Sequence, residues 1–99
     1  MDKDELKRRT KTFGIRAITL VNALPKTLVG RTLGGQLVRC ATSVGANYRA
    51  ACRARSRAEF IAKIGTVEEE ADETAFWLEM VVDAGLMKRE RILDRKSVV

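Results

Sequence analysis

Apolar side chains recur every three or four residues along most of the chain, the spacing that places them on one face of an α-helix. The first such stripe predicts a helix over residues 4–24, and Pro25 ends it because proline lacks the N–H that a helix interior uses. The stripe comprises Leu6, Phe13, Ala17, Leu20, Val21 and Leu24.

A second stripe predicts a helix that is clear from Gln36 and runs to about Arg53. Residues 25–35 hold one proline and three glycines, so we expect a turn followed by a weak helix start. Thr27 and Thr32 both carry a hydroxyl that can cap the first turn, and the pattern does not choose between them. The inward stripe is Leu33, Leu37, Cys40, Ala41, Val44, Tyr48, Ala51 and Cys52.

A capping box marks the start of the third helix. Ser56 precedes Glu59 by three residues, a spacing at which the Ser hydroxyl accepts from the Glu59 amide and the Glu59 carboxylate reaches back to the Ser56 amide. We expect this helix to run to about Ala84, with Gly85 as its C-terminal cap, and a short fourth helix to end near Lys96. The inward stripe of the third helix is predicted as Phe60, Ile64, Val67, Ala71, Ala75, Leu78 and Val82.

Two outer helix faces carry residues that are unusual for solvated surfaces. On the third helix several large apolar side chains point away from the predicted core, and on the second helix several small side chains would let another helix approach closely. We therefore expect self-association through these faces, although alanine is also simply a good helix former. The candidate interface residues are Ser43, Ala46, Ala50, Ile61, Phe76 and Met80.

Charge is unevenly distributed along this chain of 99 residues, whose net charge is +6. Residues 1–63 hold 14 Lys and Arg against four Asp and Glu, whereas residues 64–87 hold seven acids and neither Lys nor Arg. A basic surface indicates a polyanionic partner such as nucleic acid, or serves solubility alone. The candidate phosphate-contacting residues are Lys7, Arg8, Arg9, Lys11, Arg16, Arg53, Arg55 and Arg57.

The acidic stretch from Glu68 to Glu79 allows three interpretations: a metal site, an acid/base pair, or ion pairing with neighbouring helices. The sequence contains no histidine, so the commonest metal ligand and general base are both missing, and no nucleophile or phosphate-loop motif occurs. We expect no enzymatic activity, cofactor or metal, and favour pairing that fixes helix register. The candidate pairing residues are Arg39, Arg49, Glu69, Glu70 and Glu73.

The ends and cysteines indicate an intracellular chain. Residues 1–9 are charged and lack an apolar segment, so we expect no signal peptide, no membrane span and a cytoplasmic location. Cys40 and Cys52 lie too far apart along one helix to form a disulfide with each other, which fits a reducing compartment.

Three runs of residues together resemble a known family. They are residues 35–51, residues 55–63 and the run Glu69-Glu70-Ala71-Asp72-Glu73-Thr74, which continues through Phe76-Trp77-Leu78-Glu79. Over about residues 10–87 the chain resembles the bacterial four-helix-bundle proteins labelled 23S rRNA intervening-sequence proteins, which are related to accessory proteins of diversity-generating retroelements. The resemblance implies an up-down-up-down bundle, homopentameric rings, nucleic-acid binding and no established catalysis.

The sequence therefore predicts one all-α domain over residues 1–99, an antiparallel four-helix bundle with a short last helix. We expect it to self-associate, as a pentamer by resemblance, and to bind RNA or DNA through backbone charge without strong sequence specificity. An alternative is a scaffold or accessory subunit that docks a protein partner, for example a reverse transcriptase.

Overall fold

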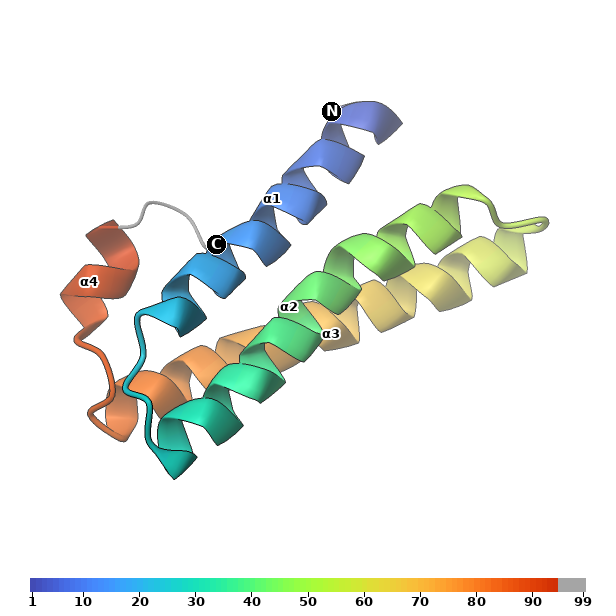
Figure 1. The fold of residues 1–99 in the computed structure, drawn as a ribbon. Helices are drawn as coiled ribbons and strands as arrows, with labels where there is room; N and C mark the ends of the chain where they lie inside the picture. The colour runs from blue at the N-terminus through green and yellow to red at the C-terminus, as the bar shows by residue number, and fades with distance from the viewer. Residues whose placement is uncertain (95–99) are drawn as a thin grey trace.

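The computed structural model describes residues 1–94, and within them the chain forms an antiparallel all-α bundle (Figure 1). Its helices are α1 (Lys3–Asn22), α2 (Leu28–Cys52), α3 (Arg57–Asp83) and the short α4 (Arg89–Asp94). The molecule measures 44 × 22 × 17 Å along its principal axes. The predicted all-α bundle with a short last helix is confirmed, and the predicted end of that helix at Lys96 lies outside the described residues.

The first two helices each begin at a side-chain cap. The Asp2 carboxylate accepts from the Glu5 amide at 2.7 Å, and the Thr27 hydroxyl accepts from the Gly30 amide at 3.1 Å. Thr27 is thus the cap of α2. Residues 25–35 form the predicted turn followed by a helix start, with the turn ending at Thr27 and with Gly30, Gly34 and Gly35 all inside the helix.

The boundaries of α3 follow the predicted chemistry with one difference. The Ser56 hydroxyl accepts from the Glu59 amide at 3.0 Å, as expected. The Glu59 carboxylate accepts from the amide of Arg55 at 2.7 Å, however, and not from that of Ser56. At the other end Gly85 takes a φ of 76° while the Leu86 amide donates to the Val81 carbonyl, which closes the helix with a left-handed cap.

The second helix is the centre of the bundle, because α1 and α3 both pack against it (Figure 1). The largest apolar cluster lies at the end of the bundle where α3 is followed by α4. Met87 and Ile92 close this end, and burying such side chains contributes about 1.5–3 kcal/mol each. The buried members are Leu20, Leu24, Leu33, Leu37, Val81, Met87 and Ile92.

The core-facing side of α3 differs from the predicted stripe. Thr74 and Val81 are buried, whereas Ala71 and Ala75 are exposed and Phe60 is 42% exposed. The helix is therefore rotated by less than one residue step of about 100° relative to the prediction. Thr74 tolerates this position because its hydroxyl donates to the Glu70 carbonyl at 2.8 Å, so a polar residue faces the core at little cost.

None of the helices in residues 1–94 combines the length and apolar character that a membrane span requires.

Candidate functional site

A hollow with a cationic rim lies along the crossing of α1 and α2. We call it the basic groove; its volume is about 450 Å³. Its rim carries the charged side chains of Lys7, Arg8, Lys11 and Arg49. Its remaining lining consists of small, hydroxyl and aliphatic residues: Thr10, Gly14, Ile15, Ile18, Thr42, Gly45 and Ala46.

Two glycines bring the helices together beneath this groove. A Cβ on Gly14 would lie 3.3 Å from the Cα of Thr42, and a Cβ on Gly45 would lie 3.3 Å from the carbonyl carbon of Thr10. Both distances are too short for comfortable packing, so the backbones approach as closely as they do because neither residue has a side chain. Because the backbones are close, the side chains of α1 that point away from the core extend over the surface of α2 and line the groove.

The floor of the groove is apolar and open. Ile15 is 53% exposed and Ile18 is 40% exposed, although both line the hollow. No carboxylate lines it among the described residues, and its four cations form no ion pair within residues 1–94. An apolar floor with a rim of one charge sign suits an occupant that brings both apolar groups and negative charge.

A second basic feature lies at the turn between α2 and α3. We call it the basic turn; it comprises Arg53, Arg55 and Arg57, all of them exposed. Within residues 1–94 none of these three side chains forms an ion pair. The carboxylate of Glu59 instead binds the backbone amide of Arg55 and holds the turn in place.

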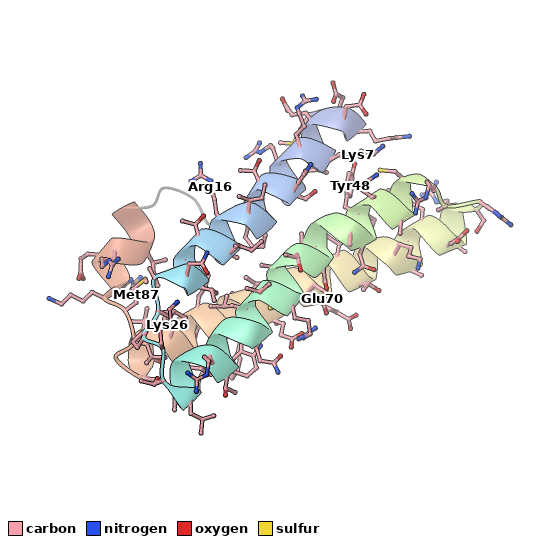
Figure 2. All side chains as sticks on the ribbon, in the orientation of Figure 1. Lys7, Arg16, Lys26, Tyr48, Glu70 and Met87 are labelled. Atoms are coloured by element: carbon pink, nitrogen blue, oxygen red, sulfur yellow. The ribbon has the colours of Figure 1, made fainter. Side chains whose placement is uncertain are left out.

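Both basic features lie at the same end of the bundle. Figure 1 shows the N-terminal end of α1 near the α2–α3 turn, and Figure 2 shows Lys7 of α1 close to Tyr48 near the end of α2. The antiparallel course of the helices therefore joins cations that are far apart in sequence. This end brings together the four cations of the basic groove and the three arginines of the basic turn.

The structure divides the predicted cations of α1 into two groups. Lys7, Arg8 and Lys11 line the basic groove, whereas Arg9 and Arg16 do not. The Arg9 guanidinium lies 3.8 Å from the sulfur of Met1. Helical geometry explains the split, because at about 100° per residue Arg9 and Arg16 both fall on the side of α1 opposite Lys11.

The acidic stretch of α3 supplies one inter-helix ion-pair cluster. The Arg39 guanidinium of α2 lies 3.4 Å from a carboxylate oxygen of Glu70 and also binds Glu73. Arg49 and Glu69, predicted to take part in such pairing, form no ion pair with any residue that the structure describes, and Arg49 lines the basic groove instead.

The remaining acids of α3 surround exposed apolar side chains. Phe76 is 51% exposed and Met80 is 38% exposed, on the side away from the buried Thr74 and Val81. We call this surface the acidic apolar face. It comprises Phe76 and Met80 together with the exposed acids Glu69, Asp72, Glu79 and Asp83. An edge-on contact at 5.1 Å with the half-buried Trp77 holds the ring of Phe76 in place.

The other predicted interface residues lie in different places. Ala46 lines the basic groove, and Ser43 and Ala50 are half-buried on α2. The hydroxyl of Ser43 donates to the Arg39 carbonyl at 2.7 Å. Ile61 is exposed near the start of α3. These positions do not form one continuous surface with Phe76.

Tyr48 is the one titratable group with a clear perturbation among the residues that the structure describes. Burial raises the pKa of its phenol above the usual 10.0, and a hydrogen bond and charge interaction with Cys52 raise it further, as do the charges of Asp2 and Asp4. The tyrosine therefore holds the end of α2 beneath α1 as a neutral, packed side chain. Both cysteines are free thiols, with Cys40 buried and Cys52 half-buried.

Among the described residues, no three His, Cys, Asp or Glu side chains are grouped so that they could hold a metal ion.

Sequence reasoning placed Gly14 and Gly45 inside predicted helices but did not identify them as points of close helix contact, so it missed the groove. Gly14, Ile15 and Ile18 belong to none of the predicted sites, and Gly45 enters only through the family resemblance. A usable signal exists: small residues recur on one face of α2 at Gly30, Gly34, Ala41 and Gly45. Such a stripe within a helix indicates close approach of a neighbouring backbone.

Comparison with known proteins agrees with this architecture. The model of the family described as 23S rRNA-intervening sequence protein matches residues 3–97. A solved structure from Bacteroides thetaiotaomicron VPI-5482, described as a protein of unknown function from the S23 ribosomal protein family, is 33% identical with a TM-score of 0.76. The match covers 90% of this chain and 82% of that one. No curated protein matches the chain.

Proposed function

The chain belongs to the 23S rRNA-intervening sequence protein family, and we propose that it is a non-enzymatic, self-associating protein that binds nucleic acid through its basic turn. The observation that carries this proposal is the set of three exposed, unpaired guanidinium groups on Arg53, Arg55 and Arg57. They lie at the end of the bundle that also carries the basic groove.

Arginine side chains suit phosphate contact without sequence reading. A guanidinium is always charged and presents donors in a planar fork that matches two phosphate oxygens. Such contacts position a protein on the nucleic-acid backbone but do not distinguish bases. Aromatic rings on which bases could stack are few near the basic turn: Tyr48 is buried and Trp77 lies in the distant half of α3, which leaves the 42% exposed ring of Phe60. We therefore expect binding to RNA and DNA with little sequence preference.

The proposal assigns binding and not catalysis. The basic turn holds arginines, which do not lose a proton in the physiological range and so cannot serve as a general base. Two acids of α3, Glu70 and Glu73, are bound by Arg39. Self-association is proposed because large apolar side chains of α3 are exposed within a ring of acids, and the resemblance suggests a pentamer.

A binding titration tests the proposal. The probes are a fluorescently labelled RNA duplex with the sequence of a ribosomal RNA hairpin stem, chosen because of the family's description, and a DNA duplex of the same sequence. Anisotropy is measured at a low and at a physiological salt concentration. We expect binding of both duplexes at low salt and clear weakening at the higher salt, since phosphate contacts release counterions. No binding at low salt would refute the function.

A further inference from the structure

We infer that the acidic apolar face of α3 in one copy of the chain docks into the basic groove between α1 and α2 of a second copy. This inference rests on the self-association in the proposed function and names the two surfaces that meet. Both surfaces are present on every copy, and each one is exposed in the single chain.

The charges of the two surfaces are complementary. The groove is rimmed by Lys7, Arg8, Lys11 and Arg49, and no carboxylate lines it among the described residues. The acidic apolar face lies in residues 64–87, which contain neither Lys nor Arg. Its four acids form no ion pair in residues 1–94, since Arg39 takes Glu70 and Glu73. Opposite charge on two unneutralised surfaces favours their encounter and fixes their orientation.

The apolar side chains of the two surfaces are also complementary. Ile15 and Ile18 line the groove and are exposed to solvent. Phe76 and Met80 are exposed among the acids of α3. A single exposed aliphatic residue is ordinary, but each of these pairs is flanked by charges of one sign. Contact between the pairs would remove all four side chains from water, and aromatic residues and Met are typical of interface cores.

The spacing of the residues sets a parallel register. Along α1 the order is Lys7, Lys11, Ile15, Ile18, and along α3 it is Glu69, Asp72, Phe76, Met80. Each series begins and ends 11 residues apart, which is about 16 Å of helix. In a parallel arrangement both lysines face acids and both isoleucines face apolar residues. An antiparallel arrangement places both isoleucines opposite acids.

The groove has room for this contact. Thr42, Gly45 and Ala46 of α2 are small, and the hollow of about 450 Å³ above them accepts a ring such as that of Phe76. The two surfaces differ, so the contact is heterologous: each copy uses its groove for one neighbour and its face for another. Such contacts form closed rings or open chains. In a closed ring every groove is covered, and Arg53, Arg55 and Arg57 belong to neither of the two surfaces.

Charge-swap variants test the inference. One variant carries Lys7→Glu and Lys11→Glu, a second carries Glu69→Lys and Asp72→Lys, and a third carries all four substitutions. The third keeps the wild-type net charge of +6 because the four changes cancel. Mass is measured by light scattering at low salt, helicity by circular dichroism, and binding of the labelled RNA duplex by anisotropy.

We expect the wild type to have a multiple of the single-chain mass and each two-site variant to fall toward the mass of one chain. The four-site variant should recover the higher mass. An equimolar mixture of the two two-site variants should rise above the mass of either variant alone, because each groove then meets a face of opposite charge, although copies that must alternate cannot close a ring with an odd number of members. A monomeric wild type, two-site variants with unchanged mass, or no recovery in both rescue samples would each overturn the inference.

The RNA measurement separates this inference from the proposed function. If the wild type fails to bind RNA at low salt, the proposed function fails while the mass results still decide the docking. If Lys7→Glu with Lys11→Glu abolishes RNA binding and leaves the mass unchanged, nucleic acid occupies the groove and the inference is overturned. Retained RNA binding by the dissociated variant supports both.

Discussion

Gly45 of α2 lies directly on the backbone of Thr10 of α1: an added Cβ would stand 3.3 Å from both the carbonyl carbon and the carbonyl oxygen of Thr10. This contact sets how closely the two helices cross. Because the contact uses backbone and not side chains, the outward residues of α1 remain free to form the rim and floor of the basic groove.

The crossing predicts an asymmetric effect of valine at two glycines of the same helix. Gly45→Val should lower the free energy of unfolding by about 1–3 kcal/mol, since the backbone of α1 must move to admit the side chain. Gly35→Val is the control; nothing lies within 4 Å of a Cβ there, so its effect should stay within about 0.5 kcal/mol. Urea denaturation monitored by circular dichroism measures both. Equal effects would show that the crossing is not tight.

The Arg39 cluster predicts a small, salt-dependent contribution to stability. Arg39→Gln should lower the free energy of unfolding by about 0.5–1 kcal/mol, because its partners Glu70 and Glu73 are only partly buried. The loss should shrink as salt is added. Glu68→Gln, which removes an exposed acid without an ion pair, should have no measurable effect at any salt concentration. Matching losses in the two variants would argue against a specific pair.

Tyr48 predicts alkaline destabilisation. Because burial raises the pKa of the folded tyrosine above 10.0, the unfolded chain loses this proton first as the pH rises. The contribution of Tyr48 to the free energy of unfolding is therefore fully present below about pH 10 and is lost as the pH rises through the pKa of the folded state. Tyr48→Phe should make the free energy of unfolding decrease less steeply between about pH 9 and 11. Thermal unfolding measured across this pH range checks the prediction. The chain has one tyrosine, so tyrosinate absorbance in the wild type reports its pKa directly.

Phe76 predicts a loss of assembly without a loss of fold. Phe76→Asp places a charge where the exposed ring stands, so light scattering should show a lower mass while circular dichroism shows nearly unchanged helicity. Leu28→Asp is the matched control, because Leu28 is 73% exposed and lies outside both proposed surfaces. The mass of that control should equal that of the wild type. An unchanged mass for Phe76→Asp would remove this face from the interface.

Much of the fold was predictable from local patterns. The stripes of α1 and α2, the Ser56 cap and the Gly85 cap each depend on residues within a few positions of one another, and the structure places them as expected. The face of α3 was misassigned because its helix is apolar on two sides. Which side meets α2 depends on long-range partners such as Arg39, which binds Glu70 and Glu73.

The candidate site was predictable in composition but not in arrangement. The cations of residues 1–63 were evident, yet their division into a groove and a turn depends on the crossing of α1 and α2 at Gly14 and Gly45. Local patterns do not show which backbone a glycine within a helix will meet, although the same glycines that weaken an isolated helix permit close packing in a bundle. Arg49 lies in the groove and not in its predicted ion pair for the same reason.

The most direct measurement of the proposed function is the salt dependence of RNA binding by a variant of the basic turn. In this variant Arg53, Arg55 and Arg57 are all replaced by Gln. The control replaces two exposed cations, Lys26 and Arg31, by Gln. Lys26 lies at the opposite end of the bundle (Figure 2), and the Arg31 guanidinium donates to the Lys26 carbonyl at 2.8 Å. Anisotropy titrations over a series of salt concentrations give the slope of log K against log salt for each protein.

The wild type should bind more weakly as salt rises, and the turn variant should lose about one unit of slope for each phosphate contact removed, so about two to three units in total. The control should keep the wild-type slope. A turn variant that binds the RNA duplex with the affinity and slope of the wild type would contradict the proposal that the basic turn holds the nucleic-acid backbone.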